Sequence, residues 1–78
     1  MKAYEEYLKF ITSAPSLEEI IEFRPTDATL GRAKYLSHMD RDGLLSKEEK
    51  TELTEYRKAE RFVSNLKIRA ERRLTAVT

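Results

Sequence analysis

The segment from His38 to Glu49 is the part of this sequence whose residue types and spacing come closest to a metal site. Aligned as a twelve-residue calcium-binding loop, it has carboxylates at positions three and five, Gly43 at position six and Glu49 at position twelve. Position one is His38, whose imidazole nitrogen is a softer ligand than the carboxylate oxygen that calcium prefers. The same residues form a turn and a helix cap without any metal. We therefore expect a structural turn and no cofactor, with a cation in this loop as the alternative.

No combination of residues in the chain predicts catalysis. His38 is the single histidine, and there is no cysteine to serve as a nucleophile. Ser37 and Asp40 lie close to His38 in sequence, but neighbouring turn residues rarely bring a nucleophile, a base and an orienting group together. The many Asp and Glu residues fall where solvated helix faces or helix caps place them. We therefore expect a protein that is not an enzyme.

Basic residues gather in segment 57–73, which could follow a phosphate backbone. This segment has seven basic and two acidic residues, a net charge of +5, whereas residues 1–30 have three basic and six acidic residues, a net charge of −3. The dipole of a helix also favours basic residues at its C-terminus without any ligand. Binding of nucleic acid is therefore the second hypothesis for function, and the residues that would carry it are Arg57, Lys58, Arg61, Lys67, Arg69, Arg72 and Arg73.

A long helix must position these basic residues. Ser46 and Glu49 have the spacing of a capping box, in which each side chain accepts a hydrogen bond from the backbone of the other residue. The helix is therefore expected to start at Ser46, after a turn made by Asp42 and Gly43. Apolar residues then recur at three- and four-residue steps along one face of this helix, namely Leu53, Tyr56, Ala59, Val63, Leu66, Ala70 and Leu74.

Shorter helices are expected before it. The first covers residues 3–12, with Tyr4, Leu8 and Ile11 on its apolar side, and the second is opened by a capping box at Ser16. Thr26 or Asp27 caps the third, which buries Leu30, Ala33 and Leu36. The alternative for Ile20–Phe23 is a short strand. The sequence thus predicts an all-α fold in one domain, residues 1–78, with short N-terminal helices packed on an antiparallel hairpin whose second arm is the long helix.

Composition limits the class of protein further. A chain of 78 residues without cysteine has a thin core and cannot form disulfides. Glu5, Glu6 and Lys9 interrupt the apolar run that a signal peptide needs, and the sequence contains no apolar stretch of membrane length. We therefore expect a cytoplasmic protein that has no contact with membrane.

The apolar stripe of the long helix is expected to extend beyond its neighbours and to form an interface. The interface is expected with a second copy, as a homodimer or higher oligomer through Val63, Leu66, Ala70 and Leu74, or with another protein. The expected partner-binding residues are Phe62, Val63, Leu66, Arg69, Ala70 and Arg73, and the expected turn and cap residues are Asp42, Gly43, Ser46 and Glu49.

Three stretches of residues 17–73 resemble a family of small cyanobacterial helical proteins that are antitoxin-like and encoded beside nucleases of PIN or HNH type. The stretches are Phe23-Arg24-Pro25, then Asp42-Gly43-x-Leu45-Ser46-x-Glu48-Glu49-x-x-Glu52-Leu53-x-x-Tyr56, then Leu66-x-x-Arg69-Ala70. The resemblance implies a helical inhibitor or accessory protein that binds a neighbouring toxin or nuclease and has no catalysis of its own.

Overall fold

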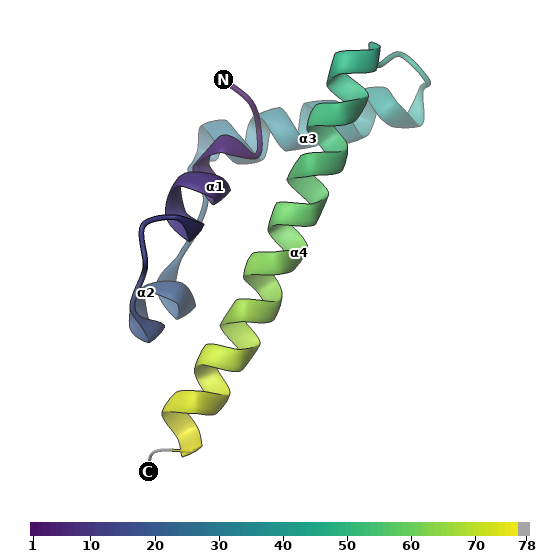
Figure 1. Ribbon diagram of the computed structural model, residues 1–78. Coiled ribbons are helices and arrows are strands. Elements are labelled where there is room, and N and C mark those ends of the chain that lie inside the picture. The colour runs from purple at the N-terminus through teal and green to yellow at the C-terminus, as the bar shows by residue number, and fades with distance from the viewer. Residues whose placement is uncertain (77–78) are drawn as a thin grey trace.

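Four helices make up the computed structural model, which describes residues 1–76 (Figure 1). They are α1 (Glu5–Ile11), α2 (Leu17–Glu22), α3 (Asp27–Arg41) and α4 (Lys47–Ala76). The expected all-α fold is confirmed, since no strand occurs within these residues and Ile20 lies in a helix. None of the helices in this part of the chain combines the length and apolar character needed to cross a membrane.

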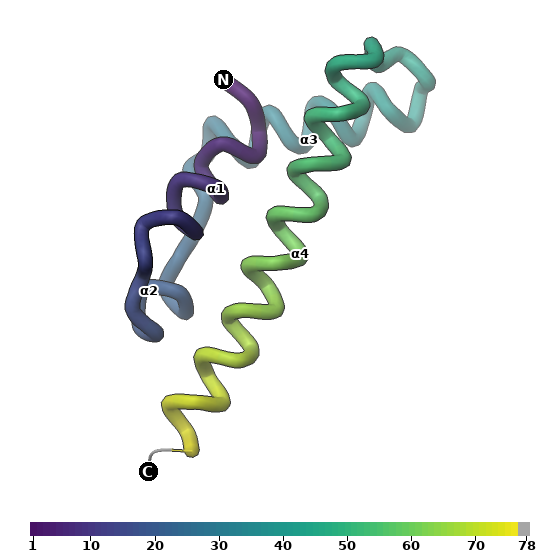
Figure 2. Tube along the Cα trace, in the orientation of Figure 1, coloured from purple at the N-terminus to yellow at the C-terminus, as the bar shows by residue number. Residues whose placement is uncertain are grey.

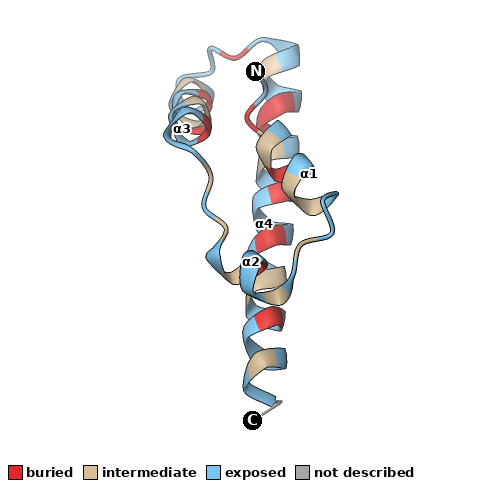
Figure 3. Cartoon of the chain, turned by 90° about the vertical axis from the view of Figure 1, so that its left-hand side faces the viewer, coloured by how far each residue is buried: buried red, intermediate tan, exposed pale blue. Residues whose placement is uncertain are grey.

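Helix α4 is the element on which the other three pack. It has 30 residues, and α1, α2 and α3 each contact it. The molecule is elongated, 50 × 20 × 19 Å, because α4 at about 1.5 Å per residue is far longer than any helix packed on it. The tube in Figure 2 shows the N-terminus beside the first half of α4, with α2 lying further along it. Buried positions accordingly follow one side of α4 (Figure 3).

Helix α3 crosses α4 rather than running alongside it (Figures 1 and 3). Arg32, in the first half of α3, contacts Glu49 and Glu52 near the start of α4, whereas Asp40, in the last turn of α3, contacts Arg57 further along. An antiparallel hairpin would give the opposite order. The structure therefore confirms that α3 packs on α4, but not that the two helices form an aligned hairpin.

The turn between α3 and α4 is built as the sequence predicts. Gly43 has a φ of 70°, a conformation that side chains disfavour, and Asp42 is the C-cap of α3. The Gly43 N–H donates to the Asp40 carbonyl (3.0 Å) and the Leu44 N–H donates to the Met39 carbonyl (2.9 Å), which is a Schellman motif. Because α3 continues to Arg41, the first four positions of the calcium-type register are helical rather than part of a loop.

The capping box at the start of α4 is also present. The Ser46 N–H donates to Glu49 Oε1 (3.0 Å), and the Glu49 N–H donates to Ser46 Oγ (3.1 Å). A second capping box joins Ser16 and Glu19 at the start of α2. Both helix starts therefore follow the local signals in the sequence.

Replacing Ser46 with Ala is expected to lower the free energy of unfolding by about 1 kcal/mol, because one N–H of the first turn of α4 loses its acceptor. Urea unfolding followed by circular dichroism measures this loss. Ser37→Ala, a change of the same chemistry within α3, is the control and is expected to change stability by less than about 0.5 kcal/mol. Equal stability of Ser46→Ala and the unchanged protein would contradict a role for the cap.

The core consists of two apolar clusters along α4. One joins the N-terminal segment, α3 and the start of α4 through Ala3, Ala33, Leu36, Leu45 and Leu53, and the other is built around Tyr7, Ala59 and Val63. Two expectations for the short helices are wrong: Leu8 is 48% exposed and Leu30 is 46% exposed. The crossing of α3 buries Thr29, Ala33 and Leu36, one helical face, and leaves Leu30 outside it.

Aromatic rings hold α1 and the end of α2 against α4. The Tyr7 ring lies edge-on to Phe23 and to Tyr56, with centroids 5.4 and 5.5 Å apart, and Phe10 stacks on Phe23 at 4.2 Å. Burial raises the pKa of the Tyr7 phenol, and the neighbouring Tyr56 adds to this effect. In the distal half of α4, Val63 and Ala70 are each only 2% exposed, so this part of the stripe is covered within its own chain, contrary to the expectation that it is unpartnered.

Candidate protein-binding groove

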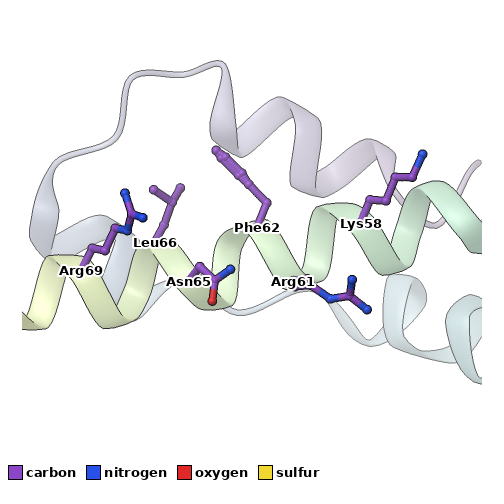
Figure 4. A pocket seen from close by; sticks show the side chains of 6 residues that line it. All are labelled: Lys58, Arg61, Phe62, Asn65, Leu66 and Arg69. Atoms are coloured by element: carbon purple, nitrogen blue, oxygen red, sulfur yellow. The ribbon is translucent and has the colours of Figure 1, made fainter.

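A shallow hollow of about 430 Å³ lies along the middle of α4 (Figure 4). Phe62 and Leu66 project from α4 toward the side on which the N-terminal helices lie. Because the two residues are four apart, a helix places them on one face, one turn apart. The residues that line this hollow are Lys58, Arg61, Phe62, Asn65, Leu66 and Arg69.

A second hollow adjoins the first between α1 and α4. Phe62 and Lys58 line both hollows, so the two adjoin each other at these residues. Helix α1 contributes Leu8 and Ile11, which are three residues apart and thus share one face of this helix. Leu8 is 48% exposed and Phe62 is 44% exposed, and Ile11 is partly buried. We call this surface the α1–α4 groove, with Leu8, Ile11, Phe62 and Leu66 as its apolar floor and Lys58, Arg61 and Arg69 as its rim.

The rim is basic because of how charges are distributed around α4. At about 100° per residue, Lys58, Arg61, Arg69 and Arg72 fall on the side of α4 opposite its buried stripe, and Arg57 and Arg73 fall at the two edges of that side. Glu60 and Glu71 fall on one flank, closer to the buried stripe. Lys58 Nζ lies 3.6 Å from Glu55 Oε1. No ion pair is formed by Arg61 or Arg69 within residues 1–76. These two guanidinium groups are therefore available to an anionic partner.

Lys67 does not belong to this basic surface. Its ammonium group donates to the Phe23 carbonyl over 2.7 Å and so caps the C-terminal end of α2. Burial lowers the pKa of Lys67, and the nearby Arg24 contributes to the same shift. The expectation that all seven cations of the segment face a common ligand is therefore wrong for this residue.

The groove brings together half of the predicted partner-binding residues. Phe62, Leu66 and Arg69 line it, and Arg73 is exposed further along α4. Val63 and Ala70 are each only 2% exposed, because they face the helices packed on α4, so neither can contact a partner in this conformation. The prediction of a dimer seam through Val63, Leu66, Ala70 and Leu74 loses two of its four residues for the same reason.

Sequence reasoning missed the other half of the groove. Their apolar spacing predicts that Leu8 and Ile11 face the core, and in the sequence Lys58 and Arg61 stand out only as members of a basic segment. Their positions relative to Phe62 follow helical spacing, so the signal was present for α4. The predicted turn and cap residues, Asp42, Gly43, Ser46 and Glu49, lie before and at the start of α4, and none of them lines the groove.

The most buried ionisable side chain is Glu52, which the sequence indicated only as an acidic residue near a helix start. It is 1% exposed and accepts two hydrogen bonds from the Arg32 guanidinium (3.0 Å each) and one from the Ala3 N–H (2.8 Å). The Arg32 guanidinium lowers the pKa of Glu52, against the opposing effect of burial. The carboxylate thus stays ionised and fully paired, which suits a structural clasp between the N-terminal segment, α3 and α4.

His38 and its neighbours form no such buried cluster. The His38 side chain is 67% exposed, and its Nε2 lies 3.8 Å from Oδ2 of Asp42, whose side chain is 52% exposed. Within residues 1–76, no three His, Cys, Asp or Glu side chains lie close enough together to hold a metal ion.

Comparison with known proteins finds no matching protein family, curated protein or solved structure. The groove, with its exposed apolar floor and basic rim, is therefore the feature from which a function can be argued.

Proposed function

We propose that this chain is a non-catalytic protein-binding module of the cytoplasm. Its partner is a toxin or nuclease encoded beside it, which it inhibits as an antitoxin does or assists as an accessory protein. The observation that carries the proposal is Phe62, a large aromatic residue that is 44% exposed at the centre of the groove. Aromatic residues and arginines are the residue types most enriched in the energetic centres of protein interfaces.

The neighbours of Phe62 support this role. Leu66 extends the apolar contact by one helical turn, and the rim cations flank it on the solvent side. Such a pattern, an apolar centre with a charged rim, is typical of a surface that excludes water around an anchor residue when a partner covers it. A partner that supplies carboxylates would pair with Arg61 and Arg69, which have no ion pair within the described residues.

The resemblance to antitoxin-like proteins suggests what the partner is. Nucleases of the PIN type bind metal with a cluster of carboxylates, and an arginine placed there could occupy the position of the cation. Arg69 at the rim and Arg73 beyond it are the candidates, since both are exposed on the distal half of α4. Inhibition would then need no chemistry from this chain.

Replacing Phe62 with Asp is expected to weaken binding of the protein encoded next to this chain by about 30-fold or more, because it removes an apolar anchor and places a charge in a desolvated centre. Co-expression of the two proteins followed by affinity purification and titration measures this effect. Leu30→Asp is the matched control, since Leu30 is similarly exposed, at 46%, but lies on α3 outside the groove. Failure of the unchanged chain to co-purify with its neighbour, or to relieve any growth defect that the neighbour causes, would refute the proposed function.

Nucleic-acid binding remains the second candidate because the solvent side of α4 carries cations with no acid between them. Arg57 and Lys58 already contact Asp40 and Glu55, which leaves Arg61, Arg69, Arg72 and Arg73 for phosphates. Neutralising about four phosphates would make the logarithm of affinity fall with that of salt concentration with a slope of about −3 to −4. If mobility-shift experiments show no binding of nucleic acid at low salt, this second candidate function is ruled out and a protein is the remaining ligand for this surface.

A further inference from the structure

We infer that the α1–α4 groove accepts a single acidic amphipathic helix of the partner protein. The inference rests on the proposed function and specifies which structure the partner presents. It is carried by two observations: the floor of the groove is made by two helices that each present apolar residues at helical spacing, and its rim is basic.

The geometry of the floor fits a helix. Leu8 and Ile11 of α1 form one side of the floor, and Phe62 and Leu66 of α4 form the other side. A helix seated between two helices contacts both through apolar residues at positions i, i+3, i+4 and i+7. The stretch from Lys58 to Arg69 spans roughly 16 Å of α4, which corresponds to about three turns of a partner helix.

The rim determines the charge of that helix. Arg61 and Arg69 are eight residues apart on α4, so their backbones are separated by roughly 12 Å along its axis. A helix lying along the groove would meet both if it carried carboxylates seven or eight residues apart, beside its apolar stripe. Lys58 is already paired with Glu55 at the α1 end, so the stronger demand for carboxylates lies toward Arg69.

A second copy of this chain fits the groove less well. In a two-fold dimer the same patch meets itself, so the rim cations of one copy would face those of the other. A nucleic acid would use the cations but has no need of Leu8 and Ile11, which lie on α1. Both occupants remain distinguishable by experiment, because the three classes of ligand depend differently on Phe62 and on the arginines.

Two synthetic peptides serve as probes for the full-length protein. Both have leucines at i, i+3, i+4 and i+7, but one has glutamates and the other lysines at the remaining rim-facing positions, and each carries a fluorescent label. Fluorescence anisotropy is expected to show binding of the glutamate peptide and none of the lysine peptide. We expect Phe62→Asp to weaken binding of the glutamate peptide by at least about tenfold. We expect the same loss of affinity from the double change Arg61→Glu with Arg69→Glu.

Two variants serve as matched controls. Ile68→Asp changes another apolar residue of α4, 50% exposed but not lining the groove, and Arg41→Glu reverses an exposed cation of α3. Both are expected to bind the glutamate peptide as the unchanged protein does. Circular dichroism of every variant verifies that the fold is retained.

Several results would overturn the inference. The inference fails if the glutamate peptide does not bind. It also fails if Phe62→Asp and the unchanged protein bind this peptide equally well. A single-stranded oligonucleotide whose binding needs Arg61 and Arg69 but not Phe62, and which displaces the peptide, would assign the surface to nucleic acid. A dimer in sedimentation that Phe62→Asp dissociates would assign it to a second copy.

The outcome is separable from that of the proposed function. If the neighbouring gene product co-purifies but the glutamate peptide neither binds nor competes with it, the function stands and the helix-in-groove inference fails. If the peptide binds through Phe62 while no neighbouring protein does, the groove has the inferred specificity and the antitoxin-like function fails.

Discussion

Arg32→Met is expected to lower the free energy of unfolding by about 3 kcal/mol at neutral pH. The change leaves the Glu52 carboxylate, 1% exposed, without the guanidinium that donates two hydrogen bonds to it. Only the Ala3 N–H would still donate to the charge, and a buried charge with one neutral donor is costly. Because Met keeps the apolar part of the side chain, the loss of stability measures the contribution of the ion pair rather than that of packing.

The loss should depend on pH in a defined direction. The Arg32 guanidinium holds the pKa of Glu52 below its ordinary value of 4.5. A carboxyl group whose pKa is lower in the folded chain contributes stability above its ordinary pKa, and this contribution is lost as pH falls through the lowered pKa. In the variant, burial acts on Glu52 without Arg32 and favours the neutral form. The stability difference between the two proteins should therefore narrow as pH falls, beginning above pH 4.5, where Glu52 of the variant takes up its proton, and continuing below that pH as Glu52 of the unchanged protein does so.

Urea unfolding of both proteins, followed by circular dichroism at neutral and acidic pH, measures these effects. Arg41→Met removes an exposed cation from the same helix and is expected to change stability by less than about 0.5 kcal/mol. Similar losses for Arg32→Met and Arg41→Met would show that the buried pair contributes nothing specific. Glu52→Gln retains the shape of the buried group and gives a second, milder measure of the same clasp.

Tyr7→Ala is expected to lower the free energy of unfolding by about 3 kcal/mol or more. Tyr7 is 4% exposed and packs edge-on against both Phe23 and Tyr56, so its removal opens a cavity where α1, the end of α2 and α4 meet. Helix α1 has only seven residues and depends on packing, because helices this short are not stable alone. Loss of Tyr7 should therefore release α1 from α4.

Hydrogen exchange and thermal unfolding separate the local from the global effect of Tyr7→Ala. The amides of α1 should lose protection first, and the groove should lose the side of its floor formed by Leu8 and Ile11. Leu8→Ala, the neighbouring change at a position 48% exposed, is expected to cost less than about 1 kcal/mol. If the two substitutions lowered stability equally, Tyr7 would not be the residue that fastens α1.

The position of Lys67 shows why counting the charges in a segment overestimates the number of cations that can contact a ligand. Seven cations in segment 57–73 give the chain a basic end, but one of them is occupied by the Phe23 carbonyl and two contact Asp40 and Glu55. Four exposed cations remain, and two of them, Arg61 and Arg69, line the same hollow as Phe62 and Leu66. The combination of charge with exposed apolar area, rather than charge alone, favours a protein over a nucleic acid as the ligand.

Features encoded by close neighbours in sequence were predictable. The caps at Ser16, Thr26 and Ser46 and the left-handed turn at Gly43 each depend on residues within about five positions of one another. Hydrogen bonds of this kind form as soon as the local backbone does, so the residue types alone indicate them. The four helices, their approximate ends and the buried stripe from Leu53 to Ala70 follow from these signals and from the helical repeat.

The tertiary structure alone decided which faces are covered. The clasp joins Ala3 to Glu52, and the Lys67 bond reaches Phe23, across 49 and 44 positions of sequence respectively. Those contacts exist because α3 crosses α4 and because the segment before it folds back over the distal half of α4. The spacing of apolar residues defines the face of a helix but not the direction from which another helix approaches. The exposure of Leu8 and Leu30, which their apolar spacing predicts to be buried, was therefore set by where the helices pack.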